Sequence, residues 1–457
     1  MPKVCIIGAG LAGLRAARHF ENFKVDYQIL EGSDRIGGRV YPFKYGSGYL
    51  QYGAEYVNGY ENEIYELVNK YNLLDINHPR TKDLWMLDDY TITVIDGKRV
   101  DQDKREKFLT FVIELDENIS LDSLSLSISK GKTVEEKIDK AFRKFLKSQP
   151  AEDHDLYRKL CSIYKNYYQT EWSSPVGELA LSNLSNWSDF TEEEDSAVLN
   201  EFGFQKILED FKSYVPQHRI RLNSKVTNIS SEDVTVTLES GERLKFDFVL
   251  VTCSLGFLKH HYKTLFTPEL SPNKVLAIER MGFGQNLKVF MEYEMPWWPE
   301  KVSTIMVVSE GETKDFMVFQ PSTWAKNILI CWIAGDGPRQ IAHLSDAQLK
   351  TILDNHLISN LSSTGPVLRS LRIHRKNWLT DEFALGSYSF LTAQGGSRDI
   401  RALGDPINGG KLGRPVIWFA GEHTDQTMYQ TTVGAARSGH LAAMGIMGAF
   451  SAFSANN

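Results

Sequence analysis

The stretch VCIIGAGLAG, residues 4–13, decides the fold of this 457-residue chain. Its first four residues are apolar, which is typical of a strand buried in a parallel sheet. The three glycines that follow have the spacing of a loop that binds a dinucleotide. Gly8 permits a tight turn, Gly10 lets the backbone approach a pyrophosphate, and Gly13 lets a helix pack closely on the strand.

The residues after this loop complete the unit. Apolar residues recur at helical spacing through 14–20, and the apolar stretch 25–30 predicts a second strand. That strand ends at Glu31, 18 residues after Gly13, where a carboxylate can accept hydrogen bonds from a ribose. The N-terminus of the helix would then face the phosphates. The order of strand, glycine turn, helix, strand and acid therefore predicts a dinucleotide-binding unit.

The composition is that of a folded globular protein, with 42% hydrophobic and 24% charged residues. The formal net charge of −7 argues against non-specific binding to nucleic acid and suits a cationic partner. No stretch approaches the roughly 18 consecutive apolar residues of a membrane-spanning helix. With no targeting stretch at the N-terminus and no peroxisomal signal at the C-terminus, we expect a cytoplasmic protein unless a leader has been trimmed.

Metal, disulfide and serine-hydrolase chemistry find little support in the sequence. Four cysteines are too few for a disulfide scaffold, and no two of them form a CxxC pair. The pair His260-His261 has no acid or cysteine at ligand spacing. The Gly-x-Ser-x-Gly elbow of a serine hydrolase does not occur. We therefore predict no metal site and no nucleophilic serine.

Several other stretches predict individual elements of secondary structure. The polar stretch 88–129 shows no clear period and is expected to be an irregular part of an inserted domain. Thr133 and Glu136 can form a capping box at the start of a helix. The expected elements are helices over 61–71, 133–147 and 432–448, a hairpin from 234 that leads into a buried strand at 246–251, and a strand over 416–420.

Several separate stretches match one family in their order along the chain. They are 8–13 with Glu31, 34–39, 53–59, 247–258, 284–299 around Lys288, Trp378 with 386–389, and 419–439. With these motifs the chain resembles the flavin-dependent amine oxidases, and within them the polyamine oxidases. The Arg-x-Gly-Gly-Arg after the acid and the Phe-Ala-Gly-Glu near the end are the more specific signals.

The resemblance implies an α/β (α+β) fold with two domains. A Rossmann-like FAD-binding domain would be built from the discontinuous segments 1–80, 200–270 and 395–457. A substrate-binding domain with a mixed sheet and helices would be formed by 81–199 and 271–394.

The resemblance also implies that FAD is the cofactor. Arg39 would contact the pyrophosphate, the backbone of Val226 the adenine, and Glu422 the region between ribityl chain and phosphate. Ser387 stands where monoamine oxidases place a cysteine that bonds to the flavin, so we expect non-covalent FAD. The residues expected to bind it are Gly8, Gly10, Gly13, Glu31, Arg39, Gly53, Ala54, Val226, Trp378, Gly421, Glu422, Thr432 and Val433.

Two residues are expected to be catalytic. Lys288 lies in an alternating strand pattern, and an inward-facing lysine is costly without a partner. The resemblance implies that it holds a water against flavin N5. Tyr388 matches one wall of an aromatic cage around the substrate amine. The opposite wall, a tyrosine in some relatives, falls on Thr431, and Tyr429 is a candidate to compensate or, alternatively, a core residue.

A polycationic substrate needs negative charge in the site. Glu171 matches a position where polyamine oxidases carry an active-site glutamate, and Glu55 is a second candidate. Asn58 stands where relatives use histidine or glutamate, which leaves the substrate open. We accordingly expect Glu171, Asn58, Glu55, Thr431 and Tyr429 to contact the substrate.

The expected function is oxidation of a polyamine by O₂, with hydrogen peroxide, an aldehyde and a shorter amine as products. A monoamine or L-amino-acid oxidase is one alternative, although Glu55 stands where an amino-acid oxidase should offer an arginine. A histone lysine demethylase is a second, but 457 residues leave no room for the long helical insertion of those relatives. A flavin-binding protein with little turnover is a third. The oligomeric state is left open.

Overall fold

The apolar run near the start of the chain forms a central strand of a parallel sheet. In the computed structural model, which describes residues 2–77, 90–186, 196–410 and 413–455, all four predicted strand residues, 4–7, are buried. The strand pairs in parallel with its neighbours on both sides. The sheet has the order β22-β23-β13-β1-β2-β9, with only β22 antiparallel to its neighbour. Its strands are β1 (Lys3–Ile7), β2 (Asp26–Leu30), β9 (Ile220–Arg221), β13 (Phe248–Val251), β22 (Ile407–Asn408) and β23 (Pro415–Phe419).

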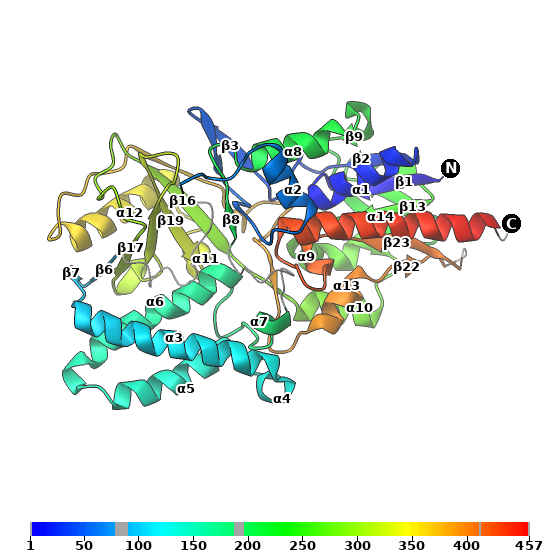
Figure 1. Cartoon of the computed structure of the whole chain (residues 1–457). Coiled ribbons are helices and arrows are strands. Elements are labelled where there is room, and N and C mark those ends of the chain that lie inside the picture. Colours follow the sequence, from blue (N-terminus) through cyan, green and yellow to red (C-terminus); the bar gives the residue numbers. More distant parts are fainter. Residues whose placement is uncertain (1, 78–89, 187–195, 411–412, 456–457) are drawn as a thin grey trace.

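Two long helices pack side by side against this sheet (Figure 1). They are α1 (Leu11–Asn22) and α14 (Thr432–Ala455), the latter seven residues longer at its C-terminus than the predicted 432–448. A Cβ atom on Gly439 of α14 would lie 2.1 Å from the carbonyl oxygen of Ala12, so only glycine permits this approach. The small residues of the last helix therefore serve close packing on the glycine-loop helix.

The predicted hairpin forms a second, four-stranded sheet beside the first. Val236 and Leu238 are buried, as the alternation predicts, and the turn at Gly241 has a φ of +85°. The hairpin then leads into the buried strand β13, which confirms the prediction. The strands of this sheet are β10 (Val226–Ser230), β11 (Thr235–Leu238), β12 (Arg243–Lys245) and β14 (Phe266–Thr267).

A seven-stranded mixed sheet forms the other half of the molecule. Leu287, Val289 and Met291 of β16 belong to the core cluster that includes α12 (Asp346–Leu361), while Phe290 belongs to a different cluster with Tyr52. Alternate residues of β16 thus face opposite sides of the sheet, as predicted. The strands, in spatial order, are β20 (Arg372–Arg375), β16 (Asn286–Glu292), β19 (Ile328–Ala334), β18 (Val318–Pro321), β17 (Thr304–Val308), β6 (Thr91–Ile95) and β7 (Lys98–Arg99).

Three helices, α3 (Gln102–Leu124), α5 (Val134–Lys147) and α6 (His154–Trp172), form a layer beneath this sheet (Figure 1). The prediction of an irregular segment over 88–129 is wrong for 90–129, and its first two positions lie outside the described residues. Phe108, Val112, Leu115 and Ile119 of α3 are buried at helical spacing, but further apolar residues at 109, 111 and 113, which are not buried, blur the period in the sequence. The predicted α5 is confirmed, with the side chain of Thr133 accepting a hydrogen bond from the amide of Glu136.

The remaining elements connect these layers. Strand β5 pairs with β8, and β15 with β21, where the chain crosses between the large sheets. The helix predicted over 61–71 is shorter at both ends.

The division into two domains stays a prediction, because the elements that connect the layers link both halves of the molecule. These elements are α2 (Glu63–Lys70), α4 (Leu126–Ser129), α7 (Asn183–Asn186), α8 (Phe204–Ser213), α9 (Leu255–Leu265), α10 (Pro272–Arg280), α11 (Gly337–Gln340), α13 (Ser397–Gly404), β3 (Pro42–Tyr45), β4 (Gly48–Gln51), β5 (Tyr56–Val57), β8 (Ala197–Val198), β15 (Gly282–Phe283) and β21 (Ser389–Phe390).

Among the helices that the structure describes, none carries an apolar stretch long enough to cross a membrane. Within the same residues, no group of three or more histidine, cysteine, aspartate or glutamate side chains could hold a metal ion.

Candidate active site

One cavity of about 2420 Å³ brings together most of the predicted site residues. It is lined by residues of both large sheets and of the helices α3 and α6. Three predicted residues, Gly13, Val433 and Tyr429, are not part of its wall. The predicted residues that line it are Gly8, Gly10, Glu31, Arg39, Gly53, Ala54, Glu55, Asn58, Glu171, Val226, Lys288, Trp378, Tyr388, Gly421, Glu422, Thr431 and Thr432.

The glycine loop presents backbone donors to the cavity. Helix α1 begins after Gly10, which offers no side-chain cap to its first amides. A Cβ atom on Gly10 would meet no atom within 4 Å, so the loop is open at this point. The carboxylate of Glu31 accepts hydrogen bonds from the amides of Ala9 at 2.7 Å and Ser33 at 2.8 Å and thereby fixes the loop. Uncapped helix amides beside an acidic residue fit the pyrophosphate and ribose of a dinucleotide.

Gly13 and Gly53 have packing roles. A Cβ atom on Gly13 would lie 2.1 Å from the carbonyl oxygen of Gly8, and one on Gly53 would lie 1.7 Å from that of Arg39. The first contact lets helix and loop approach, and the second places the segment around Ala54 directly against the arginine. Only glycine fits at either position.

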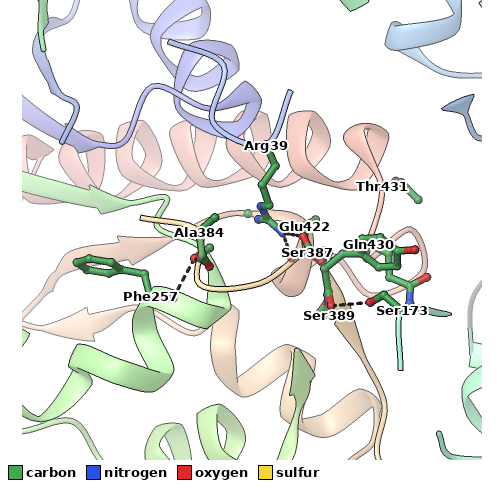
Figure 2. A network of polar contacts seen from close by, with 12 residues as sticks. Arg39, Ser173, Phe257, Ala384, Ser387, Ser389, Glu422, Gln430 and Thr431 are labelled. Atoms are coloured by element: carbon green, nitrogen blue, oxygen red, sulfur yellow. Dashed lines mark hydrogen bonds and ion pairs between the residues drawn. The ribbon is translucent and has the colours of Figure 1, made fainter. Parts of the chain in front are cut away.

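Arg39 and Glu422 form an ion pair on the cavity wall (Figure 2). Arg39 Nη1 donates to Glu422 Oε1 at 2.9 Å and to the carbonyl oxygen of Ser387 at 2.7 Å. The other oxygen, Oε2, accepts from the hydroxyl of Ser389 at 2.5 Å and from the amide of Gln430 at 2.9 Å. Burial alone would raise the pKa of Glu422, but the charge of Arg39 and these donors outweigh it, so the pKa is lowered. The carboxylate is therefore ionised and holds three segments together.

Two buried polar atoms on the same wall have no hydrogen-bond partner among the described residues: Gln430 Nε2 and Thr432 Oγ1. Buried polar atoms are nearly always paired, so unpaired ones at a cavity indicate a ligand. Gln430 has a φ of +74°, which helps the chain turn into α14. Together with the open glycine loop, this wall fits FAD.

Lys288 is buried on the cavity side of β16 and forms an ion pair with Glu55. Its Nζ donates to the Glu55 carboxylate at 2.5 Å and to the carbonyl oxygen of Gly53 at 2.7 Å. It also lies 5.3 Å from the ring centre of Trp332. Burial lowers the pKa of Lys288, and the charge of Glu55 opposes this shift. Glu55, predicted to contact substrate, is thus already engaged by the lysine.

Tyr388 is fixed by the end of helix α6. Its hydroxyl donates to the carbonyl oxygen of Thr170 at 3.0 Å and accepts from Asn286 Nδ2 at 3.1 Å. Burial raises its pKa, so the hydroxyl stays protonated. Glu171, one residue further, is exposed and lines the cavity, and Ser173 ends the helix with a φ of +50°. The structure therefore brings Tyr388 and Glu171 to one end of α6.

Ser387 and Asn58 also have defined partners. The hydroxyl of Ser387 donates to the carbonyl oxygen of Asn286 at 2.9 Å and accepts from its amide at 2.8 Å. Asn58 donates from Nδ2 to the hydroxyl of Ser196 at 2.9 Å. Trp378 donates from Nε1 to the carbonyl oxygen of Tyr52 at 2.9 Å, which holds its ring against the cavity.

Thr431 lines the cavity and also caps a helix, whereas Tyr429 stands away from the cavity. The hydroxyl of Thr431 accepts from the amide of Gly434 at 2.9 Å and so caps helix α14, although the residue still lines the cavity. Tyr429 is fully buried, and its hydroxyl donates to Asn183 Oδ1 at 3.0 Å. The structure does not bring Tyr429 to the cavity, and the core alternative describes it. Val433 likewise packs in the core behind the wall.

Sequence reasoning missed several residues on the cavity wall. Tyr56 and Trp332 stack with ring centres 6.3 Å apart and planes 16° apart. Tyr56 lies within the matched stretch 53–59 and could have been found there, whereas Trp332 is hidden in an apolar strand. Asp116 lies in the stretch that was expected to be irregular, so nothing marked its position.

Comparisons with known proteins agree with this geometry. The chain matches the family described as flavin-containing amine oxidoreductase over residues 11–447. It is 25% identical to a bovine peroxisomal N(1)-acetyl-spermine/spermidine oxidase, covering 96% of this chain and 93% of that protein. It is 24% identical to probable polyamine oxidase 5 of Arabidopsis thaliana, covering 96% of each. It is 27% identical to human lysine-specific histone demethylase 2, covering 96% of this chain but 52% of that protein. The chain therefore belongs to the flavin-containing amine oxidoreductase family.

Proposed function

We propose that the protein binds FAD without a covalent bond and oxidises polyamines such as spermine, spermidine or their acetylated forms. A polyamine, O₂ and water would give an aldehyde, a shorter amine and hydrogen peroxide. The observation that carries this proposal is one cavity whose wall joins an open glycine loop to Lys288, Tyr388 and Glu171. The first three features are those an amine-oxidising flavoprotein needs, and the last supplies a carboxylate for a cation.

The glycine loop, Glu31 and the Arg39–Glu422 pair would hold the cofactor. Arg39 supplies positive charge near the phosphates, and the N-terminus of α14 supplies it near the flavin ring. When bound, FAD would supply the redox chemistry, as acceptor of a hydride from the carbon beside the amine nitrogen and donor of the electrons to O₂. Ser387 supports non-covalent binding, because a serine hydroxyl engaged on both sides by Asn286 offers no thiolate.

The chain's own residues would position the amine and favour its neutral form over the ammonium. Tyr388 offers a fixed aromatic ring, and the stacked Tyr56 and Trp332 offer further aromatic surface. Apolar walls disfavour an ammonium and so favour the neutral amine that reacts. Glu171 would attract a second positive charge of the same substrate. Lys288 would hold its proton at Nζ beside the reacting centre, with Glu55 as its counter-charge.

Two other functions within the family are the alternatives. Relatives named lysine demethylases match the chain over 96% of its length, so a lysine side chain is a second candidate substrate class. A monoamine or L-amino-acid oxidase is a third, but the described wall near 53–59 carries Glu55 where an amino-acid carboxylate would need a cation. A flavin-binding protein with little turnover is the candidate outside catalysis.

The test is anaerobic mixing of the purified yellow protein with a panel of amines. Spermine, spermidine, N1-acetylspermine, an aryl monoamine, a neutral amino acid and a methyl-lysine peptide would be compared by bleaching of the flavin band. We expect rapid bleaching by polyamines alone, and product analysis then gives the side of cleavage. Bleaching by the monoamine, amino acid or peptide alone would assign one of the alternatives. No bleaching at all would leave a flavin-binding protein.

A further inference from the structure

Asp116, in the middle of α3, lines the same cavity as Lys288 and Tyr388. It is partly buried, and Ser120, one helical turn further along α3, lines the cavity beside it. The wall continues through Tyr167 and Tyr168 of α6. A carboxylate thus lies on the helical side of the cavity, on an element different from those that carry the reacting centre.

Two tyrosines hold this carboxylate in place. Asp116 Oδ1 accepts hydrogen bonds from the hydroxyl of Tyr168 at 2.6 Å and from that of Tyr164 at 3.0 Å. Burial raises the pKa of both tyrosines, so both hydroxyls stay protonated and donate. A carboxylate has four acceptor positions, and these two bonds use only one of its oxygens. The other oxygen, Oδ2, accepts no hydrogen bond from any residue the structure describes.

No cation in the described part of the chain forms an ion pair with Asp116. Two lysines of the same helical layer pair with other carboxylates: Lys137 with Asp122, and Lys165 with Glu135 and Asp139, both at 2.8 Å. The negative charge of Asp116 is therefore available to a cation that enters the cavity. A partly buried carboxylate without a counter-ion is costly unless a ligand supplies one.

Helix α6 carries both the tyrosines that hold Asp116 and the residues beside Tyr388. Glu171 and the partner of Tyr388, Thr170, lie at its C-terminus, whereas Tyr168 lies nearly one turn earlier. Three residues of an α-helix advance about 4.5 Å along its axis. The cavity wall thus carries two carboxylates from different helices, Asp116 in the middle of α3 and Glu171 at the C-terminus of α6.

We infer that Asp116 is the binding site for the distal ammonium of a substrate that carries two or more amines along an alkyl chain. This inference rests on the proposed function and deepens it, because it explains how the cavity separates polyamines from monoamines. Glu171 would attract a charge near the reacting nitrogen, and Asp116 the charge at the far end. The tyrosines fix the carboxylate before the substrate arrives, which reduces the entropy lost on binding.

The test compares Asp116→Asn with Glu117→Gln in the FAD-loaded enzyme. Glu117 is the next residue of α3, is exposed and does not line the cavity, so its variant makes the same charge change as a matched control. Inhibition constants would be measured for a series of α,ω-alkanediamines and for n-alkylamines of equal length. We expect Asp116→Asn to weaken the best diamine roughly tenfold, abolish the length preference and leave the alkylamines unchanged. Glu117→Gln should change neither series.

A second variant keeps the test valid if Asp116→Asn loses its fold. Ser120→Lys places an ammonium one turn from Asp116 without touching Tyr164 or Tyr168, and should weaken diamines alone in the same way. Equal losses for diamines and alkylamines, or no loss in either variant, would overturn the inference. If the wild type oxidises polyamines but Asp116→Asn keeps the preference for diamines, the role of Asp116 is rejected and the proposed function stands. If the wild type neither oxidises polyamines nor prefers diamines, the proposed function is rejected as well.

Discussion

The ammonium of Lys288 and the carboxylate of Glu55 meet at 2.5 Å on the wall of the cavity, and neither is fully solvated. The side chain of Lys288 is 6% exposed and that of Glu55 21%. Removing one member of such a pair costs far more than the pair contributes, because it leaves a charge buried without a counter-charge. At the residue scale, Glu55 therefore positions the lysine and sets its charge state.

The variant Glu55→Gln tests this role. It should destabilise the protein by about 3 kcal/mol near neutral pH, because the Lys288 charge loses its partner. Burial lowers the pKa of Lys288 below that of an unfolded lysine, about 10.4, and without Glu55 it falls further. At a pH between the lowered pKa of Lys288 in the folded variant and that of an unfolded lysine, the folded variant binds fewer protons than the unfolded variant. The stability that Glu55→Gln loses relative to the wild type should therefore shrink as the pH rises.

Guanidinium unfolding of wild type and Glu55→Gln, at about pH 7 and about pH 10, measures this difference. The double variant Glu55→Gln with Lys288→Met is the control, since it removes both charges and should show no such pH dependence. A deficit in Glu55→Gln that is equal at both pH values would contradict the assigned ion pair.

At the scale of elements, the start of α14 shows how one residue can serve two purposes. Thr431 lines the cavity, yet its hydroxyl caps the helix through the amide of Gly434. Glu422 accepts from the amide of Gln430 just before it and links the same turn to Arg39. A tyrosine at position 431 could not cap the helix in this way, so the departure from the two-tyrosine cage has a structural consequence.

The variant Thr431→Val keeps the shape of the side chain and removes the cap. We expect a loss of about 1 kcal/mol in the free energy of unfolding. Thr432→Val is the matched neighbour, because the buried Thr432 hydroxyl has no partner in the described chain, and it should lose less than about 0.5 kcal/mol. Denaturant unfolding of both variants decides between the two hydroxyls, and equal losses would argue against the cap.

Elements were predictable from sequence where a pattern is local. The glycine loop, β13 and α5 follow from short-range signals: apolar runs, glycine spacing and a threonine cap. Helix α3 was missed because apolar residues that are not buried, Leu109 and Phe111, stand between its buried residues Phe108 and Val112 and blur the helical period. Because α3 was not predicted, Asp116 could not be assigned to a helix or to the cavity wall.

At the scale of the whole molecule, the cavity lies between a parallel sheet and a mixed sheet, and these are formed by segments that are far apart in the sequence. The pairing of Lys288 with Glu55 joins positions that are 233 residues apart, and that of Arg39 with Glu422 joins positions 383 apart. Local patterns carry no information about such contacts. Of the 20 residues expected in the site, 17 line the cavity, but neither the motifs nor the resemblance indicated which of them hold one another.

We propose that one cavity binds both a flavin and a polycationic amine, with Glu171 attracting a positive charge of the amine. The most direct measurement is anaerobic stopped-flow reduction of the bound flavin by spermine, in wild type and in Glu171→Gln. We expect rapid reduction of the wild type by spermine and not by an aryl monoamine, and a roughly tenfold higher half-saturating spermine concentration in the variant. Wild-type flavin that spermine fails to reduce, or that the monoamine reduces equally well, would contradict it.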